Sequence, residues 1–256
     1  MPDATAAVMA LTAMLAGAAI GSFIGAALVR LPEGRSVLAG RSVCDACAAP
    51  IAARDLVPLV SWLALRGKCR HCGAAIGVWQ PFAEIAGALI GAAGVLLAPP
   101  GLAIPAMLLG WQLLLLALID AHHLWLPRPL TALLAATGAG FALWSGWEAA
   151  SLAPLVTAAA GGVIGFGMLW AVARGYRLLR GREGMGGGDP PLLGAIGLWV
   201  GPMGAIGTVI GASLIGLAAA LVMLLARKDI AADTALPLGT LMAMAGWAIF
   251  LVNGWG

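Results

Sequence analysis

Long stretches of this chain carry no charged residue, and this feature restricts the possible folds more than any other. Such runs cover residues 6–29, 85–119, 129–147, 151–173, 190–226 and 234–256. A helix that crosses a membrane needs about 20 consecutive apolar residues, whereas a helix on the surface of a soluble domain keeps a polar face. Only 10% of the 256 residues are charged, against about 25% in a typical soluble domain. The sequence therefore predicts an all-α polytopic membrane protein.

Two of the runs are long enough for two crossings each. In one, Pro99-Pro100-Gly101 predicts a turn, and in the other Gly201-Pro202 predicts a break. The first run exceeds the apolar core of a signal peptide and has no basic residue before it, so we interpret it as retained. The 37 glycines suit close helix packing in lipid. We predict about eight transmembrane helices, near residues 6–29, 82–98, 102–120, 129–147, 151–173, 190–202, 204–226 and 234–256.

The positions of the positive charges test this number of helices. The 14 Lys and Arg residues are divided among four segments. Eight crossings place all four on one side of the membrane, and the positive-inside rule makes that side the cytoplasm, with both termini periplasmic. The net charge of +3 then follows from topology and gives no reason to expect a nucleic-acid partner. The segments are 30–81 with seven cations, 121–129 with one, 174–189 with four, and 227–236 with Arg227 and Lys228.

All four cysteines lie in the first of these segments, as Cys44-Asp45-Ala46-Cys47 and Cys69-Arg70-His71-Cys72. Two CxxC pairs at this spacing predict a tetrahedral zinc site. Four protein ligands leave no open coordination position, so the zinc would be structural and would fold a loop too small to form its own core. A disulfide pair and four unligated thiols are alternatives, less favoured in a reducing compartment. His71 could also replace one cysteine as a ligand.

Two aspartates lie at predicted helix ends. Asp120 ends a long apolar run, and Asp189 follows Gly186, Gly187 and Gly188. The charge pattern places both at cytoplasmic ends, where acidic groups next to apolar spans are costly and often functional. Two carboxyl groups that share a proton form the catalytic pair of an aspartyl protease, in which one activates water and the other protonates the carbonyl oxygen. Such a pair would titrate as a unit.

We interpret the three glycines as a substrate loop. Without side chains, and with backbone geometries closed to other residues, they would let a substrate strand lie close to Asp189. A phosphate-binding loop is disfavoured, because no Gly-Lys-Ser/Thr ending follows and no strand precedes it. Nearby, His122 and His123 could tune Asp120 or face water, and Glu84 could pair with a loop arginine or face water.

Three other interpretations of the aspartates stay open at this point. Each could simply cap a helix or face headgroup water, and Asp189 before Pro190-Pro191 is a good candidate for an N-cap. A proton- or ion-coupled transporter would also use acids within the membrane. A zinc-stabilised membrane scaffold would need no chemistry from them.

Taken in order along nearly the whole chain, these motifs resemble the bacterial prepilin peptidases, or type IV leader peptidases, of the GxGD class of membrane aspartyl proteases. Single motifs are weak, but together they are specific. They are Gly21-Ser22-Phe23 with Arg30-Leu31-Pro32, the two CxxC pairs, Pro81-Phe82-Ala83-Glu84, Leu118-Ile119-Asp120, the segment from Glu183 to Asp189, and Leu236-Pro237-Leu238-Gly239.

The resemblance implies an enzyme of the bacterial inner membrane, surrounded by lipid, with its active site at the cytoplasmic face. It would remove the positively charged leader from type IV prepilins or type II secretion pseudopilins, using Asp120 and Asp189. In bifunctional members, the cysteine-bearing portion accompanies N-methylation of the new amino terminus from S-adenosylmethionine, and we expect both activities. The predicted domains are a first helix (1–29), a zinc-binding loop domain (30–81) and a peptidase domain (82–256).

Four positions depart from the family pattern. Asp45 stands in place of a usual proline and Gly25 in place of a usual asparagine. Arg128 stands in place of an aspartate after Leu-Pro, and Pro191 in place of a lysine after the second aspartate. The catalytic pair and the four cysteines match the pattern.

Overall fold

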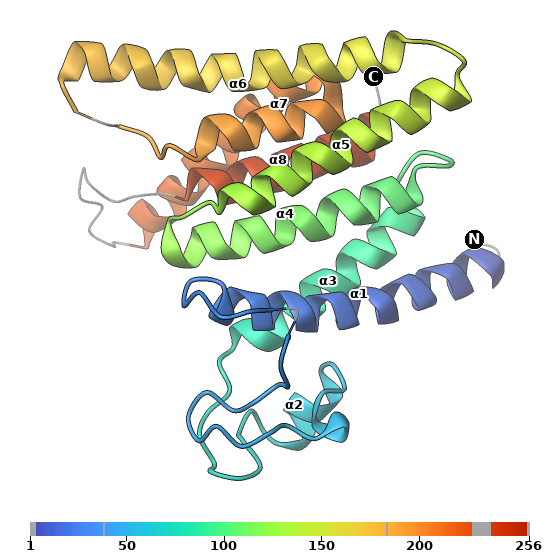
Figure 1. The fold of residues 1–256 in the computed structure, drawn as a ribbon, viewed down its shortest axis with the longest axis vertical. Coiled ribbons are helices and arrows are strands. Elements are labelled where there is room, and N and C mark those ends of the chain that lie inside the picture. The colour runs from blue at the N-terminus through green and yellow to red at the C-terminus, as the bar shows by residue number, and fades with distance from the viewer. Residues whose placement is uncertain (1–3, 38, 183, 227–236, 255–256) are drawn as a thin grey trace. The chain divides into compact units, whose positions relative to one another are not determined.

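The structure is a computed structural model that describes residues 4–37, 39–182, 184–226 and 237–254. Within these ranges, apart from two isolated β-bridges, all regular secondary structure is helical. The chain divides into two compact units, Met1–Leu97 and Ala98–Gly256, which we describe one at a time (Figure 1). The predicted all-α fold is confirmed.

The first unit is built on the antiparallel helices α1 (Ala4–Arg30) and α3 (Trp79–Leu96). Their backbones approach so closely that a Cβ on Gly17 would overlap the carbonyl group of Gly87, as the glycine content suggested. The segment between them forms a loop-rich lobe with the 3₁₀ turn η1 (Ala53–Asp55) and the short helix α2 (Val60–Ala64).

The second unit contains the remaining described helices: α4 (Ala103–His123), α5 (Arg128–Glu148), α6 (Ala153–Arg180), α7 (Asp189–Leu225) and α8 (Leu238–Asn253). Prolines in the first turns of α5, α6 and α7 fit these helix starts, because the first turn needs no backbone donor. Gly181, with φ 68°, ends α6 in the left-handed conformation that favours glycine at this position.

Aromatic side chains fill the centre of this unit. Phe141 stacks on Trp199 with ring centroids 5.3 Å apart, and Phe250 packs edge-on against both rings. The indole nitrogen of Trp199 donates to the carbonyl oxygen of Leu134 at 3.0 Å. A polar group in an apolar interior has no water to bind, so this hydrogen bond fixes the ring between α5 and α7.

Helix α7 folds back on itself at Gly201, whose φ of 71° and ψ of −177° interrupt the helix before Pro202. In a straight helix, Ile196 and Thr208 would lie about 18 Å apart. Here methyl groups of both lie beside Gly246 of α8, so the chain reverses between them. The predicted break at Gly201-Pro202 is therefore confirmed.

Six described helices are long and apolar enough to cross a membrane, and α8 is a shorter apolar helix. With α7 divided at Gly201, the described helices match the eight predicted segments. The turn at Pro99-Pro100-Gly101 lies between α3 and α4, as predicted. One boundary was wrong: α6 continues to Arg180, so Arg174 and Arg177 lie on this helix and not in a loop.

Some predictions cannot be compared with the structure. Arg227, Lys228, Glu183 and Leu236 lie outside the described residues. The division by compactness also groups α3 with α1, whereas the predicted peptidase domain began at residue 82. That functional division stays a prediction.

Candidate metal-binding and catalytic sites

The four cysteines come together in the lobe of the first unit. Their Sγ atoms all lie within 4.8 Å of one another, and those of Cys44 and Cys72 are 3.9 Å apart. Sulfur ligands about 2.3 Å from a tetrahedral zinc ion lie roughly 3.8 Å apart, so the cluster has the dimensions of such a site. All four are free thiols, which removes the disulfide alternative.

The backbone around each pair has the same conformation. The N–H of Cys44 donates to the carbonyl of Ala49 at 2.9 Å, and that of Cys69 donates to Ala74 at 2.8 Å. Isolated β-bridges close both turns at the same relative positions, Val43 with Pro50 and Lys68 with Ala75. The lobe therefore holds two copies of one knuckle, each of which contributes two sulfur atoms.

Hydrogen bonds favour the ionised form of Cys69 in the second knuckle. The backbone N–H groups of Cys72 and His71 lower the pKa of the Cys69 thiol to about 6, and metal ligands must be ionised thiolates. His71 contributes its backbone N–H, 3.4 Å from the Cys69 sulfur. The described cluster of possible ligands contains only the cysteines, so His71 does not replace one of them.

An ion pair anchors each knuckle to the rest of the lobe. Asp45 of the first knuckle accepts a hydrogen bond from Arg35 at 3.0 Å. In the second, the guanidinium of Arg70 binds both carboxyl oxygens of Asp55 at 2.6–3.2 Å and lowers the pKa of that carboxyl group. Asp45, one of the departures from the family pattern, therefore has a local partner.

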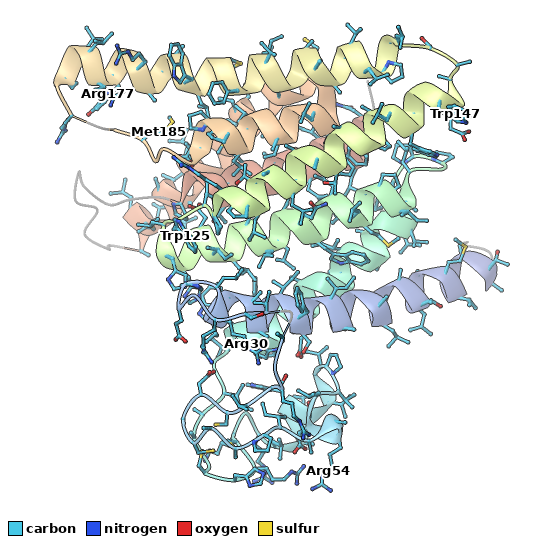
Figure 2. All side chains as sticks on the ribbon, in the orientation of Figure 1. Arg30, Arg54, Trp125, Trp147, Arg177 and Met185 are labelled. Carbon is cyan, nitrogen blue, oxygen red and sulfur yellow. The ribbon has the colours of Figure 1, made fainter. Side chains whose placement is uncertain are left out.

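The second candidate site lies in the second unit, where three helix ends meet. Asp120 is in the last turn of α4, and Asp189 is the first residue of α7. Both side chains are buried, with 5% and 6% of their surface exposed. Trp125, in the α4–α5 connection, and Met185, before α7, lie at the same end of the helices (Figure 2).

Asp120 is held by the start of α8. Its Oδ2 accepts a hydrogen bond from the backbone N–H of Thr240 at 2.8 Å. The Thr240 hydroxyl lies 3.2 Å from the same oxygen and 2.8 Å from the carbonyl oxygen of Ala117. Asp120 thus accepts a hydrogen bond from a backbone donor in the first turn of α8. The capping interpretation is therefore correct, but the helix that Asp120 caps is α8 and not α4. Sequence reasoning missed Thr240, although it directly follows the Leu236–Gly239 motif.

Asp189 does not cap α7. Gly188 occupies the N-cap position without a side-chain hydrogen bond, and Asp189 is already helical. Pro191 lies within the first turn, so it interrupts no helical hydrogen bond. The N-cap interpretation of Asp189 was wrong because the helix starts one residue earlier than that pattern requires.

The glycines before Asp189 provide space. A Cβ on Gly186 would lie 3.1 Å from Oδ2 of Asp189, and one on Gly188 would lie 2.8 Å from the side chain of Leu126. None of Gly186, Gly187 and Gly188 has a positive φ. The expectation of backbone geometries closed to other residues was therefore wrong here. What Gly186 and Gly188 provide is room, because Asp189 and Leu126 lie where the side chains of other residues would be.

The two carboxyl groups are close enough for the charge of Asp120 to act on Asp189. Leu126 lies between their supporting segments, since Cβ atoms on Gly188 and Gly239 would both meet its side chain. Two neighbouring buried carboxyl groups can hold one proton between them and so offer both an acid and a base.

The other polar residues singled out from the sequence lie elsewhere. His122 and His123 follow Asp120 but are exposed. Glu84 is buried and, among the described residues, pairs with no arginine: its Oε2 accepts the backbone N–H of Leu59 at 2.7 Å, and its Oε1 accepts the Gln80 amide at 3.0 Å.

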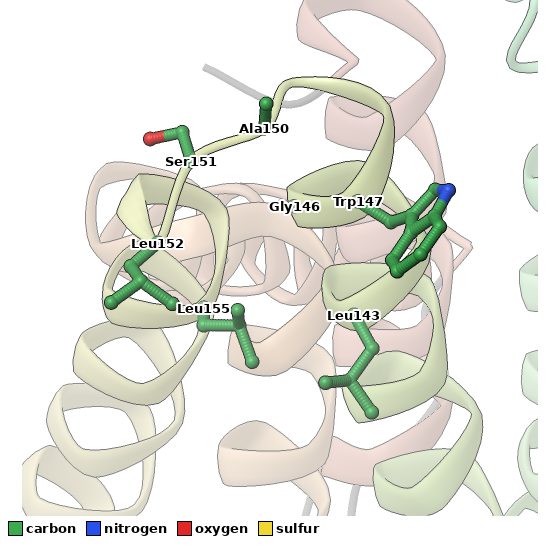
Figure 3. A pocket seen from close by; sticks show the side chains of 7 residues that line it. All are labelled: Leu143, Gly146, Trp147, Ala150, Ser151, Leu152 and Leu155. Atoms are coloured by element: carbon green, nitrogen blue, oxygen red, sulfur yellow. The ribbon is translucent and has the colours of Figure 1, made fainter.

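An open apolar hollow of about 330 Å³ lies between the end of α5 and the start of α6 (Figure 3). It contains no acidic residue and no cysteine, and it lies at the end of α5 opposite to Leu126. It is therefore not part of either candidate site. Its lining residues are Leu143, Gly146, Trp147, Ala150, Ser151, Leu152 and Leu155.

Comparison with known proteins covers both units. Residues 15–97 match the bacterial peptidase A24 N-terminal domain, and residues 107–221 match the type IV leader peptidase family. The first match ends at the same residue as the first compact unit. No solved structure matches the chain.

Curated relatives align with most of the chain. A prepilin leader peptidase/N-methyltransferase of Aeromonas salmonicida (strain A449) is 36% identical over 225 residues, 88% of this chain and 74% of the relative. Proteins of the same name from Klebsiella pneumoniae and Pseudomonas aeruginosa are 40% and 35% identical. These alignments cover 73% and 96% of this chain, and 83% and 90% of the relatives.

Proposed function

Because the chain belongs to the type IV leader peptidase family, we propose that it removes the leader peptides of prepilins or pseudopilins with Asp120 and Asp189 as its catalytic pair. It is a multi-pass inner-membrane aspartic peptidase. The transporter alternative has no support among its relatives, and the scaffold alternative does not explain membership of an enzyme family.

One observation carries the assignment of residues: two buried carboxyl groups, at the end of α4 and the start of α7, lie close enough to interact, although 69 positions separate them in the sequence. One carboxylate would take a proton from water as the water oxygen attacks the scissile carbonyl carbon. The other, protonated, would donate to the carbonyl oxygen, and proton transfer to the amide nitrogen would then let the C–N bond break. The backbone N–H of Thr240 donates to Oδ2 of Asp120, which would hold this carboxyl group in position for the reaction.

The catalytic pair is tested by single substitutions that keep shape and remove charge. Asp120→Asn and Asp189→Asn should each lower leader removal by more than about 100-fold in proteoliposomes with a prepilin substrate. Glu148→Gln, at the exposed end of α5, is the matched control and should cleave normally. Normal processing by either Asn variant would refute the assignment.

We propose that the four-cysteine cluster binds zinc with a structural role. The fit of the four sulfur atoms to a tetrahedral site supports this, and Cys44, Cys47, Cys69 and Cys72 would leave no open position on the metal. Bound zinc would hold the two knuckles together and so fold the lobe. Metal analysis of the purified chain should find about one zinc ion per chain.

We also propose methylation of the new amino terminus with S-adenosylmethionine as donor. The support is the name of the relatives, which are prepilin leader peptidase/N-methyltransferases. Mass spectrometry of mature pilin made with this enzyme should show one added methyl group. Cleaved pilin without it would leave a peptidase alone.

The proposed topology places both termini in the periplasm and both candidate sites at the cytoplasmic face. It rests on the cations at helix ends, such as Arg30 at the end of α1, Arg128 at the start of α5 and Arg180 at the end of α6, because basic residues favour the cytoplasmic side. Reporter fusions within residues 31–78 should show a cytoplasmic location, and a periplasmic signal there would reverse the assignment.

A further inference from the structure

Three polar side chains of the α1–α3 pair lie at one level of the two helices. The Gln80 amide donates to Ser22 at 3.2 Å and to Glu84 at 3.0 Å. On one side of this level, residues 4–21 of α1 and 85–96 of α3 contain no charged residue. The three polar groups therefore mark one end of the apolar part of the pair, where a membrane interface would lie.

A hydrogen bond fixes the start of α2 at this level. The backbone N–H of Leu59, which precedes α2, donates to Oε2 of Glu84 at 2.7 Å. The Glu84 side chain is buried and also accepts from Gln80, so its position is fixed by α1 and α3. The lobe thus meets the helix pair at the expected depth of the interface.

The residues on both sides of Leu59 include four exposed apolar side chains, which we call the α2 patch: Leu56, Val57, Val60 and Leu63. They are 43%, 45%, 62% and 67% exposed. Trp62 faces the interior of the lobe, since a Cβ on Gly67 would lie 2.9 Å from its ring. None of the four patch residues belongs to a predicted membrane span, so contact between spans and lipid does not by itself explain their exposure.

The neighbouring residues have the character of an interface. Trp79 and Phe82, at the start of α3, are both exposed, and their rings meet edge-on at 5.6 Å. Aromatic side chains favour the headgroup level of a membrane. Exposed Arg66 and Lys68 follow the patch in sequence and offer positive charge to lipid phosphates.

We propose that the α2 patch inserts into the membrane interface, so that lipid covers it and holds the cysteine lobe against the membrane surface. An apolar face flanked by cations is the composition of an interfacial segment, which buries its apolar side about 5–10 Å into the boundary between headgroups and acyl chains. The Leu59–Glu84 hydrogen bond sets the depth, and Val60 and Leu63 make the contact.

The test uses the full-length protein in liposomes of phosphatidylethanolamine and phosphatidylglycerol. A fluorescent amino acid replaces Leu63 in one sample and Ala46, an exposed residue of the first knuckle that is not a ligand, in a matched control. The Leu63 probe should lose most of its emission to a lipid-borne quencher and little to aqueous iodide. The Ala46 probe should behave in the opposite way.

Two results would overturn the proposal. Quenching of the Leu63 probe by iodide would show a patch that faces water, and shielding from both quenchers would show that protein covers it. Metal content serves as the folding control. If the Leu63 substitution lowers it, the same probe at Val60 replaces it in the test, with the same outcomes required.

Discussion

The cysteine cluster and the aspartate pair are built in opposite ways. The cluster comes from two knuckles in one short segment, each closed by its own backbone hydrogen bonds, and it lies in a partly exposed lobe. The aspartate site is buried and needs the ends of α4, α7 and α8 to meet. We therefore expect the cysteine cluster to be disrupted by loss of a single ligand. The aspartate site should instead be disrupted by changes in how α4, α7 and α8 pack.

The largest expected effect tests whether the metal acts locally. Cys69→Ser should abolish stoichiometric metal binding, which is worth on the order of 10 kcal/mol in small structural zinc sites. Hydrogen exchange should then rise across residues 42–76 and stay unchanged in α4. His71→Ala, in the same knuckle, should keep its metal. Faster hydrogen exchange in α4 as well would contradict the view that the metal stabilises only its own lobe.

The next effect tests packing around the aspartates. A Cβ on Gly239 would lie 2.9 Å from Oδ2 of Asp120, and overpacking costs about 1–3 kcal/mol. Gly239→Ala should therefore lower the rate of leader removal roughly tenfold or more, measured in proteoliposomes. Gly140→Ala in α5, where a Cβ meets nothing within 4 Å, is the control. Equal rates for both variants would show that this contact is unimportant.

A smaller effect separates the Thr240 hydroxyl from its backbone. Thr240→Val keeps the N–H bond to Asp120 and removes the hydroxyl donor, which is worth about 1 kcal/mol. Leader removal should slow about fivefold and its pH profile should move, because one donor to the carboxyl group is lost. Thr240→Ser should restore both. A slower rate with an unchanged pH profile would indicate a purely structural role.

The smallest effect belongs to the ion pair behind the second knuckle. Arg70 lowers the pKa of Asp55, so the pair stabilises the lobe above the ordinary carboxyl pKa of about 3.9 and is lost as the pH falls through the lower folded value. At pH 7, Asp55→Asn should speed metal loss to a chelator by less than about fivefold. A purified Asp55→Asn protein without metal, as expected for Cys69→Ser, would mean that Asp55 is needed to hold the knuckle together.

The sequence predicted the features that depend on residues close together in the chain. Apolar runs located the helices, Gly201-Pro202 located the break in α7, and the CxxC spacing located the cluster. It did not show that Thr240 binds Asp120, because 120 positions separate them and only the packing of α8 against α4 joins them. Nor did it show that Glu84 binds a backbone N–H of Leu59, since no side-chain pattern identifies a backbone donor.

The reversal of α7 at Gly201 has a consequence for how the chain enters the membrane. The half of α7 that precedes Gly201 is only about 18 Å long. This length is well short of the thickness of the hydrocarbon core of a bilayer, roughly 30 Å. A nascent chain that had emerged only this far would present the translocon with too little apolar length to be released into lipid. We therefore expect Asp189 to reach its final depth only after residues 202–225 have been synthesised, when both halves partition into the bilayer as one hairpin.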